Sequence, residues 1–143
     1  MSNLRLKYFD LSPEAMQAFR AVKGVLAKSV LGSVLLELVY LRISQINGCS
    51  FCLDMHTKAL REHGESQQRL DVVAGWRVST LFTPKERAAL EWAEALTDVA
   101  TTHADDTYYL PLKEHLSDVE IADLTFAVAL MNALNRLAIG MRQ

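Results

Sequence analysis

Two cysteines, a histidine and a glutamate stand at spacings that suit thiol chemistry. Cys49 and Cys52 are three residues apart, His56 follows the second by four residues, and Glu37 precedes the first by twelve. A thiolate, not a thiol, is the nucleophile, and the ordinary pKa of a cysteine is about 8.5. A nearby imidazole can take the thiol's proton, and a carboxylate can orient that imidazole. The pattern therefore predicts a dithiol redox centre in which Cys52 reacts and Cys49 then closes a disulfide with it.

The elements around these residues are a turn and the start of a helix. The Asn-Gly pair at 47–48 predicts the end of one helix, because such a pair tolerates positive φ. The next helix is expected over 49–64, with Cys49, Cys52 and His56 projecting from one face. Cys52 would lie in the first turn, where unpaired N–H groups and the positive end of the dipole favour a negative sulfur.

Glu37 lies in a segment, 34–46, that is apolar almost all round and therefore reads as a buried helix. A buried carboxylate is costly unless it is paired. One interpretation is a structural ion pair with a neighbouring Arg or Lys. The cysteine motif favours another hypothesis, in which Glu37 and His56 form a relay that lowers the pKa of Cys52. Asp54 points to another face of its helix and is expected in solvent.

The spacing E-x11-C-x-x-C-x-x-x-H resembles the signature of the AhpD-like alkylhydroperoxidases, which belong to the carboxymuconolactone decarboxylase superfamily. The flanking segment 41–48 and the late segment 131–136 are also similar to that family. Some members carry a further histidine immediately before the second cysteine. This chain has Phe51 there, so a five-residue proton relay is not carried over whole.

The resemblance implies a thiol-dependent peroxidase or disulfide reductase of the peroxiredoxin type, active in antioxidant defence. Its catalytic residues would be Cys52, Cys49, His56 and Glu37. It implies small organic hydroperoxides as substrates and a thioredoxin-like or lipoyl-type dithiol as the external reductant, with no bound cofactor and no metal. It also implies a homo-oligomer, either a trimer or a hexamer.

Helix signals recur along the rest of the chain. Start signals stand at 12–14, 83–86 and 117–120, each with a hydroxyl residue at the N-cap position and an acidic residue in the first turn. No run of alternating β-branched residues predicts a strand. The expected fold is therefore all-α, with about six or seven helices and the C-x-x-C at the N-terminus of a central helix. A chain of 143 residues is expected to form a single domain, 1–143.

Composition excludes several kinds of partner. The net charge is −2 and no basic stripe is interleaved with aromatic residues, which argues against nucleic acid and anionic membranes. The longest late uncharged run, 124–135, is shorter than the roughly 20 residues of a membrane span, and no signal peptide is evident at the N-terminus. A cysteine pair without a secretory signal predicts a cytoplasmic protein. Apolar residues make up 50% of the chain, which favours buried subunit contacts in a homo-oligomer.

Three other functions remain open from the residues alone. Zinc would accept Cys49, Cys52, His56 and Glu37, although the usual second pair of ligands is missing. A redox-responsive interaction protein without turnover is a further alternative, and lactone decarboxylation is a weaker one because it does not need a dithiol. The polar residues in segment 132–136 (Asn132, Asn135 and Arg136) are expected to form a structural network near the cysteine-bearing helices.

Overall fold

The computed structural model describes residues 3–143, and the regular secondary structure in this range is all helical, with no strand. The prediction of an all-α fold is confirmed. The elements in chain order are α1 (Tyr8–Leu11), α2 (Pro13–Leu26), α3 (Ser33–Asn47), α4 (Ser50–Glu62), α5 (Gln67–Asp71), the 3₁₀ helix η1 (Val73–Val78), α6 (Pro84–Thr97), α7 (Val99–Thr102), α8 (Asp106–Tyr109), the 3₁₀ helix η2 (Leu110–Glu114) and α9 (Asp118–Met141).

Five long helices, α2, α3, α4, α6 and α9, have between 13 and 24 residues each. The expected number of helices, six or seven, is larger than the number of long helices and smaller than the number of all elements. The full set also includes segments of four to six residues. Segments that short carry too few apolar residues for a helical period to be visible in the sequence.

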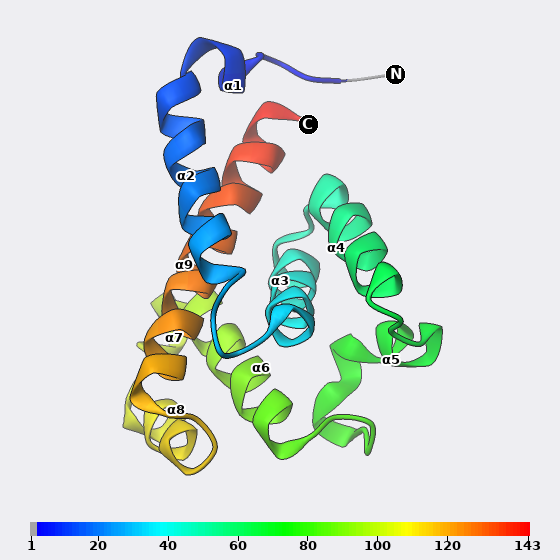
Figure 1. Ribbon diagram of the computed structural model, residues 1–143, viewed down its shortest axis with the longest axis vertical. Helices are drawn as coiled ribbons and strands as arrows, with labels where there is room; N and C mark the ends of the chain where they lie inside the picture. Colours follow the sequence, from blue (N-terminus) through cyan, green and yellow to red (C-terminus); the bar gives the residue numbers. More distant parts are fainter. Residues whose placement is uncertain (1–2) are drawn as a thin grey trace.

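Helix α3 is the centre of the fold, because α4, α6 and α9 all pack against it. Its interior residues Leu38, Val39 and Ile43 are fully buried, as its apolar sequence predicts. Helix α9 crosses the molecule beside α2, so that the C-terminus comes close to α1 (Figure 1). The backbone N–H of Arg5 donates to the carbonyl of Met141 at 2.8 Å and ties the two ends of the described chain together.

The start signals in the second half of the chain place their helices as predicted. Thr83 and Ser117 each accept a hydrogen bond from the N–H three residues on, and the side chains of Glu86 and Glu120 bond back, which completes two capping boxes. At the earlier signal α2 begins at Pro13 as expected, but the Ser12 side chain makes no capping hydrogen bond.

Helix α9 is long and apolar enough, by length and composition, to cross a membrane. The uncharged run 124–135 is shorter than this helix, because Asp123 and Arg136 bound the run inside α9. In this fold α9 packs against α2, α3, α4 and α6, and Leu124, Ala127 and Met131 on its inner face are fully buried. Its apolar character is accounted for by this place in the bundle.

A polar network joins the end of α3 to α9. Asn47 Nδ2 donates to the side-chain oxygens of Asn132 and Asn135, both at 3.0 Å. Asn135 Nδ2 in turn donates to Ser44 Oγ at 3.1 Å, and Arg136 donates to the Asn132 side chain at 3.1 Å. The expected structural network is therefore present, and it fixes the last turn of α3 immediately before the cysteines.

Candidate redox site

The cysteines follow a tight turn between α3 and α4. Gly48 ends α3 with φ of 70°, a left-handed conformation that glycine adopts without steric cost. Cys49 is the N-cap of α4, and its Sγ accepts a hydrogen bond from the N–H of Cys52 at 3.4 Å. Cys52 lies in the first turn of α4, as predicted, and in this oxidised state it is joined to Cys49. Because the N-cap side chain folds back over the first turn, the sulfur that receives the N–H is that of Cys49.

Cys49 and Cys52 are joined by a disulfide, with their Cα atoms 5.3 Å apart. Their side chains are almost completely buried, with exposed fractions of 1% and 2%. The structure is therefore that of the oxidised dithiol, and the pairing expected from the spacing is present.

His56 lies one helical turn beyond Cys52, and its Nδ1 is 2.6 Å from Glu37 Oε2. The histidine is fully buried and the Glu37 side chain is 16% exposed. The alternative partner for Glu37, a nearby Arg or Lys, is wrong: Arg42 on the same helix pairs instead with Glu94 at 2.8 Å. A carboxylate at Nδ1 favours the tautomer that carries its proton there and leaves Nε2 as an acceptor. In the described part of the chain, that Nε2 is buried and has no hydrogen-bond partner.

Tyr40 is a neighbour of this pair that sequence reasoning missed. Its ring centroid lies 5.3 Å from that of His56. Burial, together with the negative charge of Glu37, raises the pKa of Tyr40 above its ordinary value, so the phenol keeps its proton. Tyr40 follows Glu37 by three residues on the same helix, and this spacing was the available signal.

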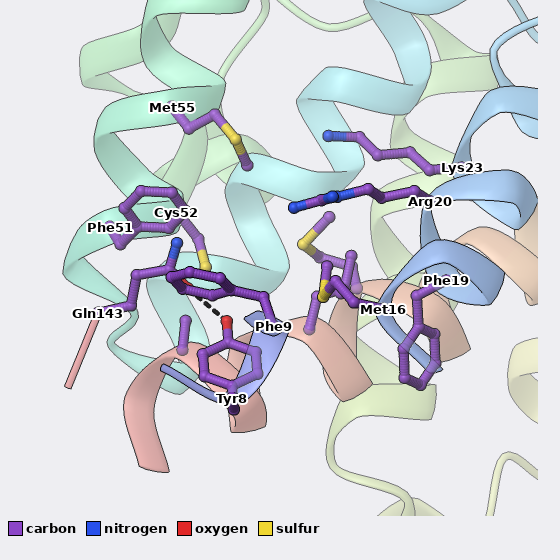
Figure 2. A pocket seen from close by; sticks show the side chains of 13 residues that line it. Tyr8, Phe9, Met16, Phe19, Arg20, Lys23, Phe51, Cys52, Met55 and Gln143 are labelled. Atoms are coloured by element: carbon purple, nitrogen blue, oxygen red, sulfur yellow. Dashed lines mark hydrogen bonds between the residues drawn. The ribbon is translucent and has the colours of Figure 1, made fainter. Parts of the chain in front are cut away.

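A cavity of about 200 Å³ opens beside Cys52. Figure 2 shows Cys52 on one wall, from α4, and the side chains of Arg20 and Lys23 extending from α2 toward α4. The full lining is Tyr8, Phe9, Met16, Phe19, Arg20, Lys23, Phe51, Cys52, Met55, Met131, Leu134, Ala138 and Gln143. Cys49 does not line this cavity and faces a smaller one of about 120 Å³ with Ser50, Ile139 and Arg142. Of the two sulfurs, Cys52 is thus the one presented to the larger space.

The structure brings together Cys49 with Cys52, and Glu37 with His56, all within the contact between α3 and α4. Asp54 lies outside this group: its side chain is 68% exposed and pairs with Lys58 at 2.8 Å, as expected for a solvated residue. Within residues 3–143 no three His, Cys, Asp or Glu side chains are arranged to hold a metal ion.

Sequence comparison agrees with this site. The sequence model of the Carboxymuconolactone decarboxylase family matches residues 13–95, which include both cysteines, His56 and Glu37. The uncharacterised protein YdfG of Bacillus subtilis is 33% identical over 137 residues, which cover 96% of this chain and 93% of that protein.

Solved structures show the same fold. A protein of unknown function from Agrobacterium tumefaciens, for which a role as the antioxidant defence protein AhpD has been suggested, superposes with a TM-score of 0.94 at 40% identity and covers 99% of this chain and 97% of its own. An uncharacterised peroxidase-related protein from Ralstonia eutropha, described as an alkylhydroperoxidase AhpD core, gives 0.81 at 25% identity over 94% of this chain and 73% of its own. This chain belongs to the carboxymuconolactone decarboxylase family and is one of its AhpD-like members.

Proposed function

We propose that the protein is an oxidoreductase of the alkylhydroperoxidase type, which reduces small organic hydroperoxides, or disulfides, through Cys49 and Cys52. One observation carries this proposal: the buried disulfide presents Cys52 to an apolar cavity, on the same helix as a histidine that is hydrogen-bonded to a carboxylate. The AhpD-like relatives support the same class of chemistry.

The proposed cycle begins when an external dithiol, thioredoxin-like or lipoyl-type, gives two electrons to the disulfide and leaves both cysteines reduced. The Cys52 thiolate then attacks one oxygen of the hydroperoxide, the O–O bond breaks, and the other oxygen leaves as the alcohol after taking a proton. Cys52 is now a sulfenic acid. Cys49 attacks its sulfur, water leaves, and the disulfide forms again. No bound cofactor takes part.

His56 and Glu37 are the proposed proton-handling pair. Within residues 3–143, Nε2 of His56 is a buried acceptor without a partner, and an unsatisfied buried acceptor costs free energy in this oxidised state. Reduction of the disulfide supplies that partner in our proposal, because the freed Cys52 thiol can donate to Nε2. Glu37 then balances the charge of the imidazolium when the thiolate forms.

The proposed setting is the cytoplasm, where dithiol reductants are present. A homo-oligomer, either a trimer or a hexamer, is part of the same proposal. Large apolar side chains that remain exposed on the described chain support it, among them Val25, Val78 and Phe126, which are 70%, 92% and 65% exposed.

The test is consumption of an organic hydroperoxide in the presence of dithiothreitol. Wild type should show turnover and Cys52→Ser should lose it, whereas Asp54→Asn, a change at an exposed residue two positions away, should retain it. A wild type that forms the disulfide once but never turns over would instead indicate a redox-responsive protein without catalysis. Wild-type rates in Cys52→Ser would remove Cys52 from the reaction altogether.

A further inference from the structure

Two positive charges face the cavity beside Cys52. Arg20 and Lys23 lie three residues apart on α2, and Figure 2 shows both side chains pointing from that helix toward α4. Within residues 3–143 neither makes an ion pair with a carboxylate, and no Asp or Glu lines the cavity. Lys23 Nζ lies 6.0 Å from the centroid of the Tyr40 ring.

Three other arginines of the described chain have carboxylate partners. Arg42 and Arg69, whose side chains are each 17% exposed, are paired with carboxylates at 2.8 Å or less. Arg77 also has a carboxylate partner, Glu94, at 2.9 Å. Arg20, which is exposed, and Lys23, which is half-buried, line an apolar cavity and have no carboxylate partner within residues 3–143.

The walls between these charges and the cysteine are apolar. Phe9, Met16 and Met55 line the space, with Phe19 and Leu134 nearby in the same lining. Such walls favour a hydrocarbon chain, since burial of apolar surface contributes about 25 cal/mol per Å². An anion beside two cations in a partly enclosed site is attracted more strongly than at the open surface. The cavity therefore suits a ligand with a hydrocarbon body and a negatively charged end.

We propose, resting on the peroxidase function above, that the preferred substrate is an organic hydroperoxide that also carries a carboxylate, such as a hydroperoxide of a short- or medium-chain fatty acid. Arg20 and Lys23 bind the carboxylate, the chain lies against the apolar walls, and the hydroperoxide meets Cys52. The cavity volume of about 200 Å³ is below the roughly 300–1,000 Å³ of sites for drug-sized ligands. This volume limits the hydrocarbon chain of the substrate to short or medium length. The products are the hydroxy acid and water, with two thiols oxidised to the disulfide.

The first experiment compares kcat/KM for a medium-chain hydroperoxy acid and for its methyl ester, with dithiothreitol as the reductant. Dithiothreitol is uncharged at neutral pH, so a preference for the acid arises from the peroxide. Wild type should favour the acid, and Arg20→Gln/Lys23→Gln should lower the acid-to-ester ratio by about fivefold to tenfold. The charge-conserving pair Arg20→Lys/Lys23→Arg should restore most of it. Raised salt should lower the wild-type ratio, because it screens the cations.

Lys28→Gln is the matched control, since it removes one positive charge just beyond α2 from an exposed residue that does not line the cavity. It should leave the ratio unchanged. An equal rate for acid and ester in wild type, or a ratio that survives in the double variant, overturns the carboxylate site while the peroxidase function stands.

Binding of octanoate to the oxidised protein, measured by calorimetry, keeps the inference testable even without turnover. Octanoate should bind wild type and Lys28→Gln more tightly than it binds Arg20→Gln/Lys23→Gln. Equal binding to all three refutes the site. Octanoate binding in a protein that consumes neither peroxide would instead refute the proposed function and leave a carboxylate-binding cavity.

Discussion

The hydrogen bond between Glu37 and His56 should control how readily Cys52 reacts near neutral pH. Glu37→Gln keeps an oxygen acceptor beside Nδ1 of His56 but removes the negative charge that stabilises an imidazolium. Less thiolate should then form at Cys52 at pH 7, and alkylation of Cys52 should be slower. At pH 9, above the ordinary pKa of about 8.5 for a cysteine, the thiol ionises without help and the difference should shrink.

The size of the effect follows from the geometry. The two atoms are 2.6 Å apart and His56 is fully buried, so the bond is of the charge-assisted kind that contributes about 1.5–3 kcal/mol. That free energy corresponds to roughly a tenfold to hundredfold change in the thiolate population. Nucleophilicity falls as a thiolate becomes less basic, with a Brønsted coefficient of about 0.4–0.5, which offsets half of the gain. The alkylation rate at pH 7 should therefore fall by about threefold to tenfold.

The assay is iodoacetamide alkylation followed by intact mass in a Cys49→Ser background, so that Cys52 is the thiol being measured. Serine is a good N-cap residue and should preserve the start of α4. Asp54→Asn is the matched control, because it makes the same change of carboxylate to amide at an exposed residue. His56→Gln should show the same pH dependence as Glu37→Gln, and the double variant should be little slower than the slower single one. If either folded single variant alkylates at the background rate at pH 7, that residue is structural and the relay is wrong.

Three further predictions concern stability and assembly. Burial alone would raise the pKa of Glu94, but hydrogen bonds donated by Trp76, Arg42 and Arg77 hold this pKa below its ordinary value. The negative charge of Glu94 therefore stabilises the fold fully above the unfolded-state pKa of about 4.3. This stabilisation is lost as the pH falls through the lower pKa of the folded state. Glu94→Gln should therefore lower the free energy of unfolding by about 1–2 kcal/mol at pH 7 and by clearly less at pH 3 in urea titrations, and an equal loss at both pH values would contradict this. Gly48→Ala should lower the free energy of unfolding by about 1 kcal/mol, because the space around a new Cβ is open and only the positive φ is unfavourable. An unchanged urea midpoint would contradict this and show that the turn adapts. The size of the protein in solution should be a multiple of 16.0 kDa, and a clean monomer at micromolar concentration would refute the homo-oligomer.

Local signals in the sequence predicted the helices well, because they act over three or four residues. The capping boxes at Thr83 and Ser117 and the glycine stop at Gly48 place helix ends where the structure has them. The redox pair was predictable for the same reason: Cys49 and Cys52 lie within one helical turn.

Long-range contacts were harder to foresee. The cavity brings α1 and α2 against α4 and the end of α9, and nothing in the spacing of Phe9 or Gln143 indicates that they meet Cys52. Glu37 had two candidate kinds of partner in the sequence, and only the crossing of α3 and α4 selects His56 over a basic residue. The cation pair on α2 had a weak signal in the sequence, since Met16, Arg20 and Lys23 stand at i, i+4 and i+7 on one helical face. That face lines a cavity only because other elements pack opposite it, and the sequence does not show which elements these are.

The residues that line the cavity come partly from the family-matching segment 13–95 and partly from outside it. The redox groups Glu37, Cys49, Cys52 and His56 all lie within residues 13–95, the part that matches the family. About half of the residues that line the cavity come from outside that part, namely from α1 and from the C-terminal segment 131–143, which contains the last turns of α9. Substitutions in those two segments can reshape the cavity without altering the sulfur chemistry. Under the proposed function, relatives that share these four residues can differ in substrate through changes confined to the two ends of the chain.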